Sequence, residues 1–313
     1  MFKLIVNEWI KIFSRKGTYV MIGILLLSVI GLGILAKTSG VADPNTDWKK
    51  ELAQENANMK EQLKGVNNPT LEKNYERSIA INEYRIKHDM PEDGKYSAMS
   101  FINDAGDVIS LTGLFVITVA AGIVANEFSW GTVKLLVIRP ISRFKILLAK
   151  YITVLLFGLA LLVILYASAG ITGLALFGAG DGSQVHLAYV DGSVEEKNLL
   201  LHLGVGYLMK SISLLMMATM AFMISAVFRN SSLAVGISIF LLAVGGTATN
   251  LLSLKFDWVK YILFANTDLS QYFDGEPLVS GMTLGFSVTV LAVYYIIFQV
   301  LAFGVFTKRD IAS

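Results

Sequence analysis

The chain has 313 residues, of which 54% are apolar and only 16% are charged, with a formal net charge of +2. Soluble domains average about 25% charged residues, so this chain has too few charges to cover a water-facing surface. The near-neutral balance excludes the basic footprint of nucleic-acid binding. The absence of cysteine excludes disulfides, thiolate zinc sites and iron–sulfur clusters. The composition therefore predicts an integral membrane protein.

Six intervals of the chain contain no Asp, Glu, Lys or Arg, and each approaches or exceeds the roughly 20 residues that a helix needs to cross a bilayer. They are apolar on all sides and do not alternate, which excludes surface helices and barrel strands. The predicted fold class is all-α, with six transmembrane helices, an N-terminal interfacial helix and a helical ectodomain between the first two spans. The uncharged intervals are 17–36, 108–126, 151–180, 211–228, 230–254 and 277–307. The spans that we assign from them are 17–36, 106–126, 147–180, 199–228, 230–254 and 281–307.

Basic residues in short loops predict the orientation of the chain. With the N-terminus inside, the inner segments hold eleven Lys and Arg, and the two short outer loops, 181–198 and 255–280, hold three. The outer segment 37–105 is too long to count, because long loops translocate largely regardless of charge. We expect a multi-pass protein of the bacterial plasma membrane with both termini cytoplasmic, including the tail 308–313.

Residues 1–16 predict an amphipathic helix lying in the cytoplasmic interface. Its apolar residues recur at helical spacing, between lysines and polar residues. Trp9 would lie at headgroup depth, with Lys11, Arg15 and Lys16 directed toward anionic lipid. The alternative is an ordinary basic flank of the first span. The apolar residues of this stretch are Phe2, Ile5, Val6, Trp9, Ile10 and Phe13.

Residues 37–105 predict an extracellular helical hairpin. Two stretches with helical periodicity, about 47–64 and 69–87, are separated by a turn in which Asn68 suits an N-cap and Pro69 the first helical position. The hairpin could gate or contact a substrate, or act as a spacer or dimer contact, and the pattern does not rank these roles.

The outer loop 181–198 predicts a β-hairpin, because Asp191-Gly192 is a type I′ turn signal. Since two strands alone are marginal, we expect this hairpin to lean on the ectodomain. His186 and His202 lack partners at metal-ligand spacing and are interpreted as interfacial polar residues. Lys210 is interpreted as an anchor that extends to the outer headgroups.

The segment 127–146 is the most informative part of the sequence. Gly131 is suited to ending the second span, and Ser129 or Thr132 to capping a new turn. A short crosswise helix over 133–138 would follow. Arg139 precedes a proline and so disfavours helix, and Pro140 suits the first position of the next helix. Glu127 lies at a helix C-terminus, where it opposes the macrodipole, so we expect a basic partner for it, in this chain or in another protein. The alternative interpretation is that the basic residues here only obey the positive-inside rule.

These residues carry a resemblance to a known family. The pattern Glu127…Gly131-Thr132…Lys134-Leu135-Leu136…Arg139-Pro140-Ile141-Ser142-Arg143…Lys150, with six spans and an interfacial helix, resembles the permease subunit of an ABC-2 type transporter. The stretch from Phe222 to Ser232 is similar as well, and the resemblance covers nearly the whole chain. The large ectodomain departs from the plainest members, whose outer loops are short.

The resemblance implies that 127–146 is a coupling segment that docks onto a separate ATPase subunit. Two permeases, this chain with a second copy or a related chain, would work with two ATPases, which bind the ATP and Mg. The implied cargo is an amphipathic substrate for export, such as an antimicrobial peptide, a lipid or a drug. The docking residues that we expect are Glu127, Trp130, Gly131, Thr132, Lys134, Arg139, Pro140 and Arg143.

The motifs that are missing fit the same interpretation. The chain contains no GxxxxGK[ST] phosphate loop, and no carboxylate falls inside the six uncharged intervals, where ion-coupled carriers usually bury one. We therefore expect no enzymatic activity, no cofactor of its own and no nucleic-acid partner. The alternative function is a membrane sensor or scaffold, whose ectodomain receives a ligand and whose cytoplasmic loop signals.

Overall fold

The structure is a computed structural model, and it describes residues 1–39, 47–65, 69–90, 96–132, 141–179, 185–190, 192–228, 230–274 and 277–308. Within these ranges six helices are long and apolar enough to cross a membrane, which confirms the all-α membrane fold class. Five are α2 (Lys16–Thr38), α8 (Arg143–Phe177), α9 (Leu199–Phe228), α10 (Ser231–Ser253) and α13 (Leu284–Lys308). The remaining span is formed by α5 (Ala98–Ala105), the 3-10 turn η1 (Gly106–Val108) and α6 (Ile109–Ser129) in succession.

The helices extend beyond the uncharged intervals, because a charged side chain can remain in a helix when it has a partner. The segment predicted over 127–146 overlaps both neighbouring helices, so the connection between α6 and α8 is only 130–142. Residues 96–105 belong to the bundle rather than to the ectodomain, since Phe101 is buried and α5 packs against α8. Residues 199–209, which the sequence also allows as a separate interfacial segment before the fourth span, are part of an unbroken α9.

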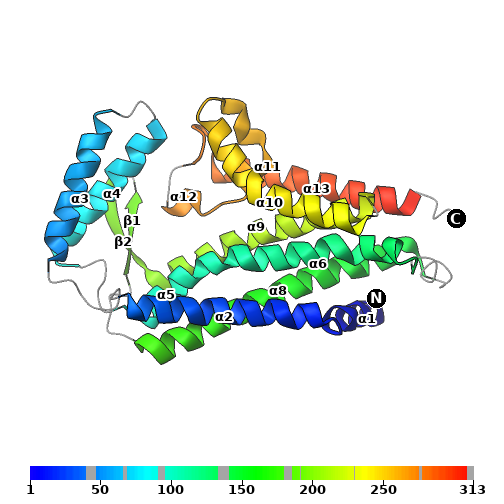
Figure 1. The fold of residues 1–313 in the computed structure, drawn as a ribbon. Helices are drawn as coiled ribbons and strands as arrows, with labels where there is room; N and C mark the ends of the chain where they lie inside the picture. Colours follow the sequence, from blue (N-terminus) through cyan, green and yellow to red (C-terminus); the bar gives the residue numbers. More distant parts are fainter. Residues whose placement is uncertain are drawn as a thin grey trace.

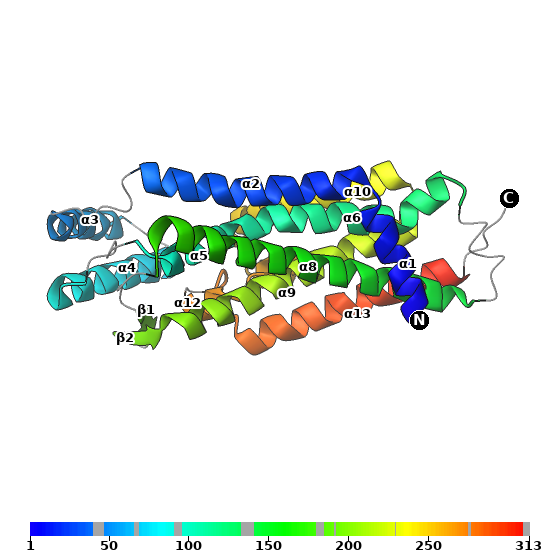
Figure 2. The ribbon, with the colours of Figure 1, turned by 90° about the horizontal axis from the view of Figure 1, so that it is seen from below.

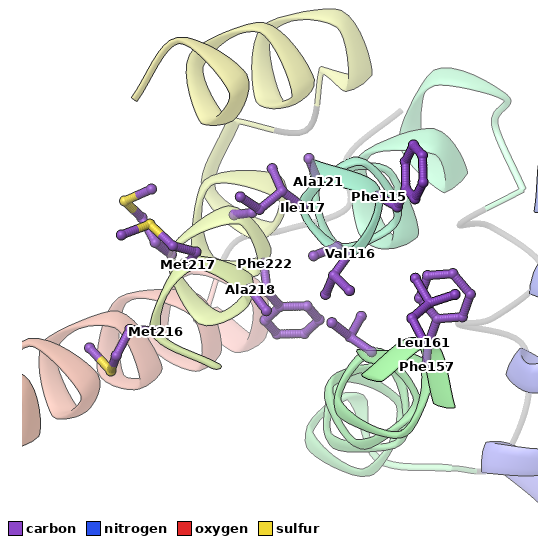
Figure 3. Packing of buried hydrophobic residues seen from close by; sticks show 14 of the residues in the cluster. Phe115, Val116, Ile117, Ala121, Phe157, Leu161, Met216, Met217, Ala218 and Phe222 are labelled. Carbon is purple, nitrogen blue, oxygen red and sulfur yellow. The ribbon is translucent and has the colours of Figure 1, made fainter. Parts of the chain in front are cut away.

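The α5–α6 span is the central element of the bundle. Of its most apolar stretch 67% is buried, against 17% for each of α2, α10 and α13, whose large apolar side chains face outward as lipid contact requires. Figure 3 shows Val116 of α6 and Phe222 of α9 pointing into the space between α6, α8 and α9. Both are fully buried, as is Phe157 of α8.

The two ends of the bundle differ in character (Figures 1 and 2). At one end lies α1 (Phe2–Phe13), which crosses the ends of the long helices and is followed by a bend at Ser14 and Arg15. This is called the α1 end below. The opposite end carries α3 (Trp48–Leu63), α4 (Pro69–His88), β1 (Val185–Val190) and β2 (Ser193–Asn198), together called the polar unit.

The polar unit is held together by a few specific contacts. Helices α3 and α4 pack as a hairpin, with a buried hydrogen bond from Asn82 Nδ2 to Asn56 Oδ1 of 3.0 Å. The two strands pair antiparallel, and Tyr84 Oη donates to Glu196 Oε1 at 3.2 Å, which joins α4 to β2. The β-hairpin thus packs against the helical hairpin, as predicted. This contact supports the two strands, which would be only marginally stable alone.

The outer loop predicted over 255–280 contains the 3-10 turn η2 (Asp257–Tyr261) and two short helices, α11 (Leu263–Asn266) and α12 (Gln271–Asp274). Asn266 explains why this segment folds back on the bundle. Its buried side-chain amide donates to two backbone carbonyls at 2.8 Å, and its Oδ1 accepts from Ser287 Oγ at 2.6 Å. The segment is thereby attached to the start of α13.

Candidate functional site at the α1 end

Three charged side chains from three helices meet inside the α1 end. Lys150 of α8 is 1% exposed, and its Nζ lies 2.7 Å from Glu8 Oε2 of α1 and 2.7 Å from Glu127 Oε1 of α6. The same Nζ donates to the backbone carbonyl of Ile123 at 3.3 Å. A buried ammonium requires such partners, because desolvation of an unpaired charge costs several kcal/mol.

Lys11 completes the set, which we call the ion cluster: Glu8, Lys11, Glu127 and Lys150. Its Nζ lies 2.7 Å from Glu8 Oε1 and 3.2 Å from Glu127 Oε1. Two lysines and two glutamates balance, so the ion cluster is formally neutral. Glu127 therefore has two basic partners in this chain, Lys11 on α1 and Lys150 on α8.

The electrostatics of the α1 residues follow from this arrangement. Burial alone would raise the pKa of Glu8, but the charges of Lys150 and Lys11 and their hydrogen bonds outweigh it and lower that pKa. Burial alone would lower the pKa of Lys11, but Glu8 and Glu127 outweigh it and raise that pKa. Both α1 residues are therefore ionised at neutral pH.

Helix α1 contacts the bundle along only one side. Ile12 is buried, and Trp9 and Phe13 are half-buried against the bundle, with ring centroids 4.8 Å apart. Ile10 (59% exposed) lies on the opposite side from Ile12, and Phe2 (77% exposed), on the stripe of Trp9 and Phe13, is exposed at the start of the helix. This exposed apolar side is what an interfacial helix would present to lipid.

The residues that end α6 are placed by local interactions. Gly131 adopts a φ of +70°, a left-handed conformation that favours glycine after a helix. Thr132 Oγ1 donates to the carbonyl of Glu127 at 3.3 Å, so Thr132 satisfies a carbonyl near the end of α6. The turn that Ser129 or Thr132 was expected to cap lies outside the described residues. Trp130 is 63% exposed, and the guanidinium of Arg15 lies 5.2 Å from its ring centroid. This is a second link between the α1 region and the connection 130–142.

The start of α8 differs from the sequence expectation. Ser142 is its N-cap and accepts from the N–H of Lys145 at 3.4 Å, and Arg143 is the first helical residue. The helix thus begins after the position where Pro140 was expected to start it. Lys134, Arg139 and Pro140 lie outside the described residues, as does the crosswise helix expected over 133–138.

The remaining predicted anchors are distributed over both ends. Lys16 is exposed at the start of α2. Lys11 was expected to face lipid headgroups, but it contacts the two glutamates of the ion cluster. Lys210 lies at the opposite end of the bundle, with its Nζ 3.4 Å from Asp107 Oδ1. Of these three lysines, Lys16 is exposed, whereas Lys11 and Lys210 each lie close to a carboxylate of this chain.

Sequence reasoning missed Glu8 and Lys150 as site residues. Lys150 falls within the third span as predicted, 147–180, and within α8, but sequence reasoning assigned it no partner. Two features of the sequence could have indicated them. Glu8 is the one acidic residue of α1, and Lys150 is preceded by Ile146-Leu147-Leu148-Ala149 and followed by an apolar span, so each charge requires a partner. Among the described residues no group of three or more His, Asp or Glu side chains could hold a metal ion. The interactions that the site does show are ion pairs.

Comparison with known proteins gives the chain a family. A family model described as "Protein of unknown function (DUF2705)" matches residues 76–312, which include α6, α8 and the connection between them. The chain belongs to this family. The DUF2705 match begins after α1, so Glu8 and Lys11 lie outside the matched range.

Two curated proteins of Bacillus subtilis (strain 168) are similar to this DUF2705 chain. "Uncharacterized protein YhcI" is 56% identical over 315 residues, covering all of both chains. "Uncharacterized membrane protein YdbK" is 36% identical over 197 residues, covering 62% of this chain and 76% of that protein. The printed name of the second agrees with the membrane fold described above.

Proposed function

We propose that this chain is the membrane-spanning permease subunit of an ATP-driven ABC-2 type exporter, with its energy supplied by a separate ATPase. The observation that carries the proposal is the ion cluster at the α1 end. It joins the helices on both sides of the connection 130–142 to α1, so a displacement of that connection moves three helices together.

The chemistry of the connection fits a docking surface for another protein. Trp130 is exposed on it, and exposed aromatic residues are typical of binding surfaces. Glu127, by contrast, is 13% exposed and already paired with two lysines, so we assign it to positioning the docking segment rather than to direct contact with the ATPase. Lys134, Arg139 and Arg143 supply the positive charge of the segment.

In this proposal the α1 end is cytoplasmic in the plasma membrane of a Gram-positive bacterium. A second permease copy or a related chain completes the pathway, and the cargo is an amphipath such as an antimicrobial peptide, a lipid or a drug. The chain itself carries out no ATP chemistry. Binding of ATP by the partner subunits would draw them together and displace the connection 130–142, and with it α6 and α8.

The test is co-purification of the chain with an ATP-binding cassette ATPase of the same organism, followed by ATP hydrolysis in lipid nanodiscs. The variant Lys134→Glu with Arg139→Glu should abolish co-purification and the stimulation of hydrolysis by the permease. A matched control is Lys255→Glu with Lys260→Glu, which reverses two charges beyond the far end of α10. Unchanged association and hydrolysis in the first variant would refute the docking assignment.

A second candidate, a membrane sensor, is favoured by one observation. The polar unit is joined to α9, because the side chain of Asn198 at the end of β2 accepts from the N–H groups of Leu200 and Leu201 at 2.9 and 3.2 Å. A ligand on that unit would act directly on a transmembrane helix. Co-purification with a histidine kinase in place of an ATPase would support this candidate.

A further inference from the structure

The last turns of α6 are engaged from outside the helix. Ser225 of α9 is fully buried, and its Oγ accepts from the backbone N–H groups of Val124 at 3.3 Å and Ala125 at 3.0 Å. In a regular α-helix each N–H donates to the carbonyl four residues earlier. Ser225 therefore competes with the helix for two consecutive donors, and side chains inserted into this hydrogen-bond ladder are a known cause of helix bending.

The carbonyl side of the same turn is engaged from a different helix. Lys150 Nζ donates to the carbonyl of Ile123 at 3.3 Å. In a regular helix that carbonyl accepts from the N–H of Glu127. Three consecutive residues of α6, 123–125, thus have main-chain hydrogen bonds to α8 and α9, directly before the segment that ends the helix.

Asn126 adds a third attachment at the same level. A Cβ at Gly122 would lie 2.7 Å from Asn126 Nδ2, so the asparagine side chain folds back over a position where only glycine leaves room. Its Oδ1 accepts a hydrogen bond from Ser231 Oγ at the start of α10. The tip segment, defined as residues 126–132, is therefore attached to α10 as well.

We propose that residues 122–125 are a joint in α6 about which the tip segment turns, and that Ser225 is the positioning residue that sets the angle of the tip. This inference rests on the proposed function, because the tip segment leads into the connection that would receive the ATPase. It also gives a physical role to the stretch from Phe222 to Ser232. In that stretch Ser225 accepts the two amides of α6, and Asn230 caps α10 by accepting from the N–H of Leu233 at 3.0 Å.

The joint has two arrangements with equal numbers of donors satisfied. In one, Ser225 accepts the amides of Val124 and Ala125, as in this structure. In the other, those amides donate only to the carbonyls of Ala120 and Ala121, and the tip segment takes a different angle. Because a net hydrogen bond in a protein is modest, loss of the serine acceptor should change the ratio of the two arrangements about fivefold for each bond.

The experiment measures the tip angle in the full chain without any ATPase. Since the chain has no cysteine, spin labels attach only where cysteines are introduced. Ser129→Cys places one label on the exposed last residue of α6, and Ser39→Cys places the reference at the far end of α2. Pulsed electron paramagnetic resonance in lipid nanodiscs then gives the distance distribution with and without Ser225→Ala. Ser238→Ala is the matched control, because Ser238 Oγ of α10 is equally buried and has no hydrogen-bond partner in the described part of the chain.

Ser225→Ala should move or split the distance peak, and Ser238→Ala should leave it in place. An unchanged peak in Ser225→Ala, or an equal shift in both variants, would overturn the joint. If Ser225→Ala does not fold, Ser231→Ala, which releases Asn126, must displace the same peak, and an unchanged peak there is equally decisive. No ATPase is present, so this result is separate from the co-purification that tests the proposed function.

Discussion

Substitution of Lys150 by methionine tests the ion cluster most directly. Methionine retains most of the apolar stem of lysine but carries no charge. The packing of the side chain therefore changes little, whereas the positive charge between Glu8 and Glu127 is removed. Glu8 and Glu127 would then lie close together with Lys11 as their remaining basic partner in the cluster. The site would pass from formally neutral to a net charge of −1.

The magnitude follows from burial. Lys150 is 1% exposed and Glu8 is 8% exposed, so removal of the lysine leaves an uncompensated buried charge, which costs about 3–5 kcal/mol. Lys11→Met is the matched control. The side chain of Lys11 is 42% exposed and screened by solvent, so its loss should cost at most about 1 kcal/mol.

The assay is the free energy of unfolding of the purified chain in detergent, measured for the single variants and for Lys150→Met combined with Glu127→Gln. The double variant restores a neutral site and should recover more than 1 kcal/mol of the loss, since groups in one charge network do not behave additively. Equal costs for Lys150→Met and Lys11→Met, or strict additivity with Glu127→Gln, would refute the reasoning.

Three further predictions concern other parts of the molecule. Because the pKa of Glu8 is lowered, its stabilising charge is fully present above the ordinary value of 4.5 and is lost as pH falls through the lowered pKa. Because the pKa of Lys11 is raised, its contribution is lost only above 10.5. A spin label near the start of α1 should therefore stay immobile from pH 5 to 9 and gain mobility in acid. Arg15→Ala should weaken the attachment of the connection 130–142 by about 0.5–1 kcal/mol, and increased quenching of Trp130 fluorescence by acrylamide would report it, whereas Lys16→Ala should have no such effect. Gly245→Val should destabilise the protein by about 1–3 kcal/mol, because a Cβ at position 245 would overlap the ring of Phe264. Thermal unfolding measures this loss, and an unchanged midpoint would contradict the prediction.

The sequence was sufficient for the six spans, because the cost of placing a charge in lipid leaves long uncharged intervals. The uncharged intervals end before the helices do for the same reason. A search for uncharged intervals stops at Lys150, whereas the helix continues through it, since Glu8 and Glu127 compensate the charge. Likewise, the uncharged interval begins only after Asp107, yet the helical span continues through η1 and α5 toward the polar unit.

The ion cluster itself could not be derived from local pattern. Glu8 and Lys11 lie 116 to 142 residues away from Glu127 and Lys150 along the chain, and Glu127 and Lys150 are themselves 23 residues apart. Helical spacing placed Lys11 on a solvent-facing edge of α1, but it gave no information on which helices lie beside that edge. The sequence did indicate that Glu127 requires a basic partner, because a negative charge at a helix C-terminus is unfavourable. The identity of that partner depends on how α8 packs against α6.

Helix α9 runs without interruption from Leu199 to Phe228, a length of about 45 Å at 1.5 Å per residue. Its first turn is tied to β2 through Asn198, and its last turns carry the hydroxyl of Ser225. Because α9 is one continuous helix, a rotation imposed at its first turn would also rotate its last turns. An antibody fragment or peptide that rotates the β1–β2 pair should therefore change the position of Ser225 at the opposite end of α9. A spin label at the α1 end would then detect binding to the polar unit.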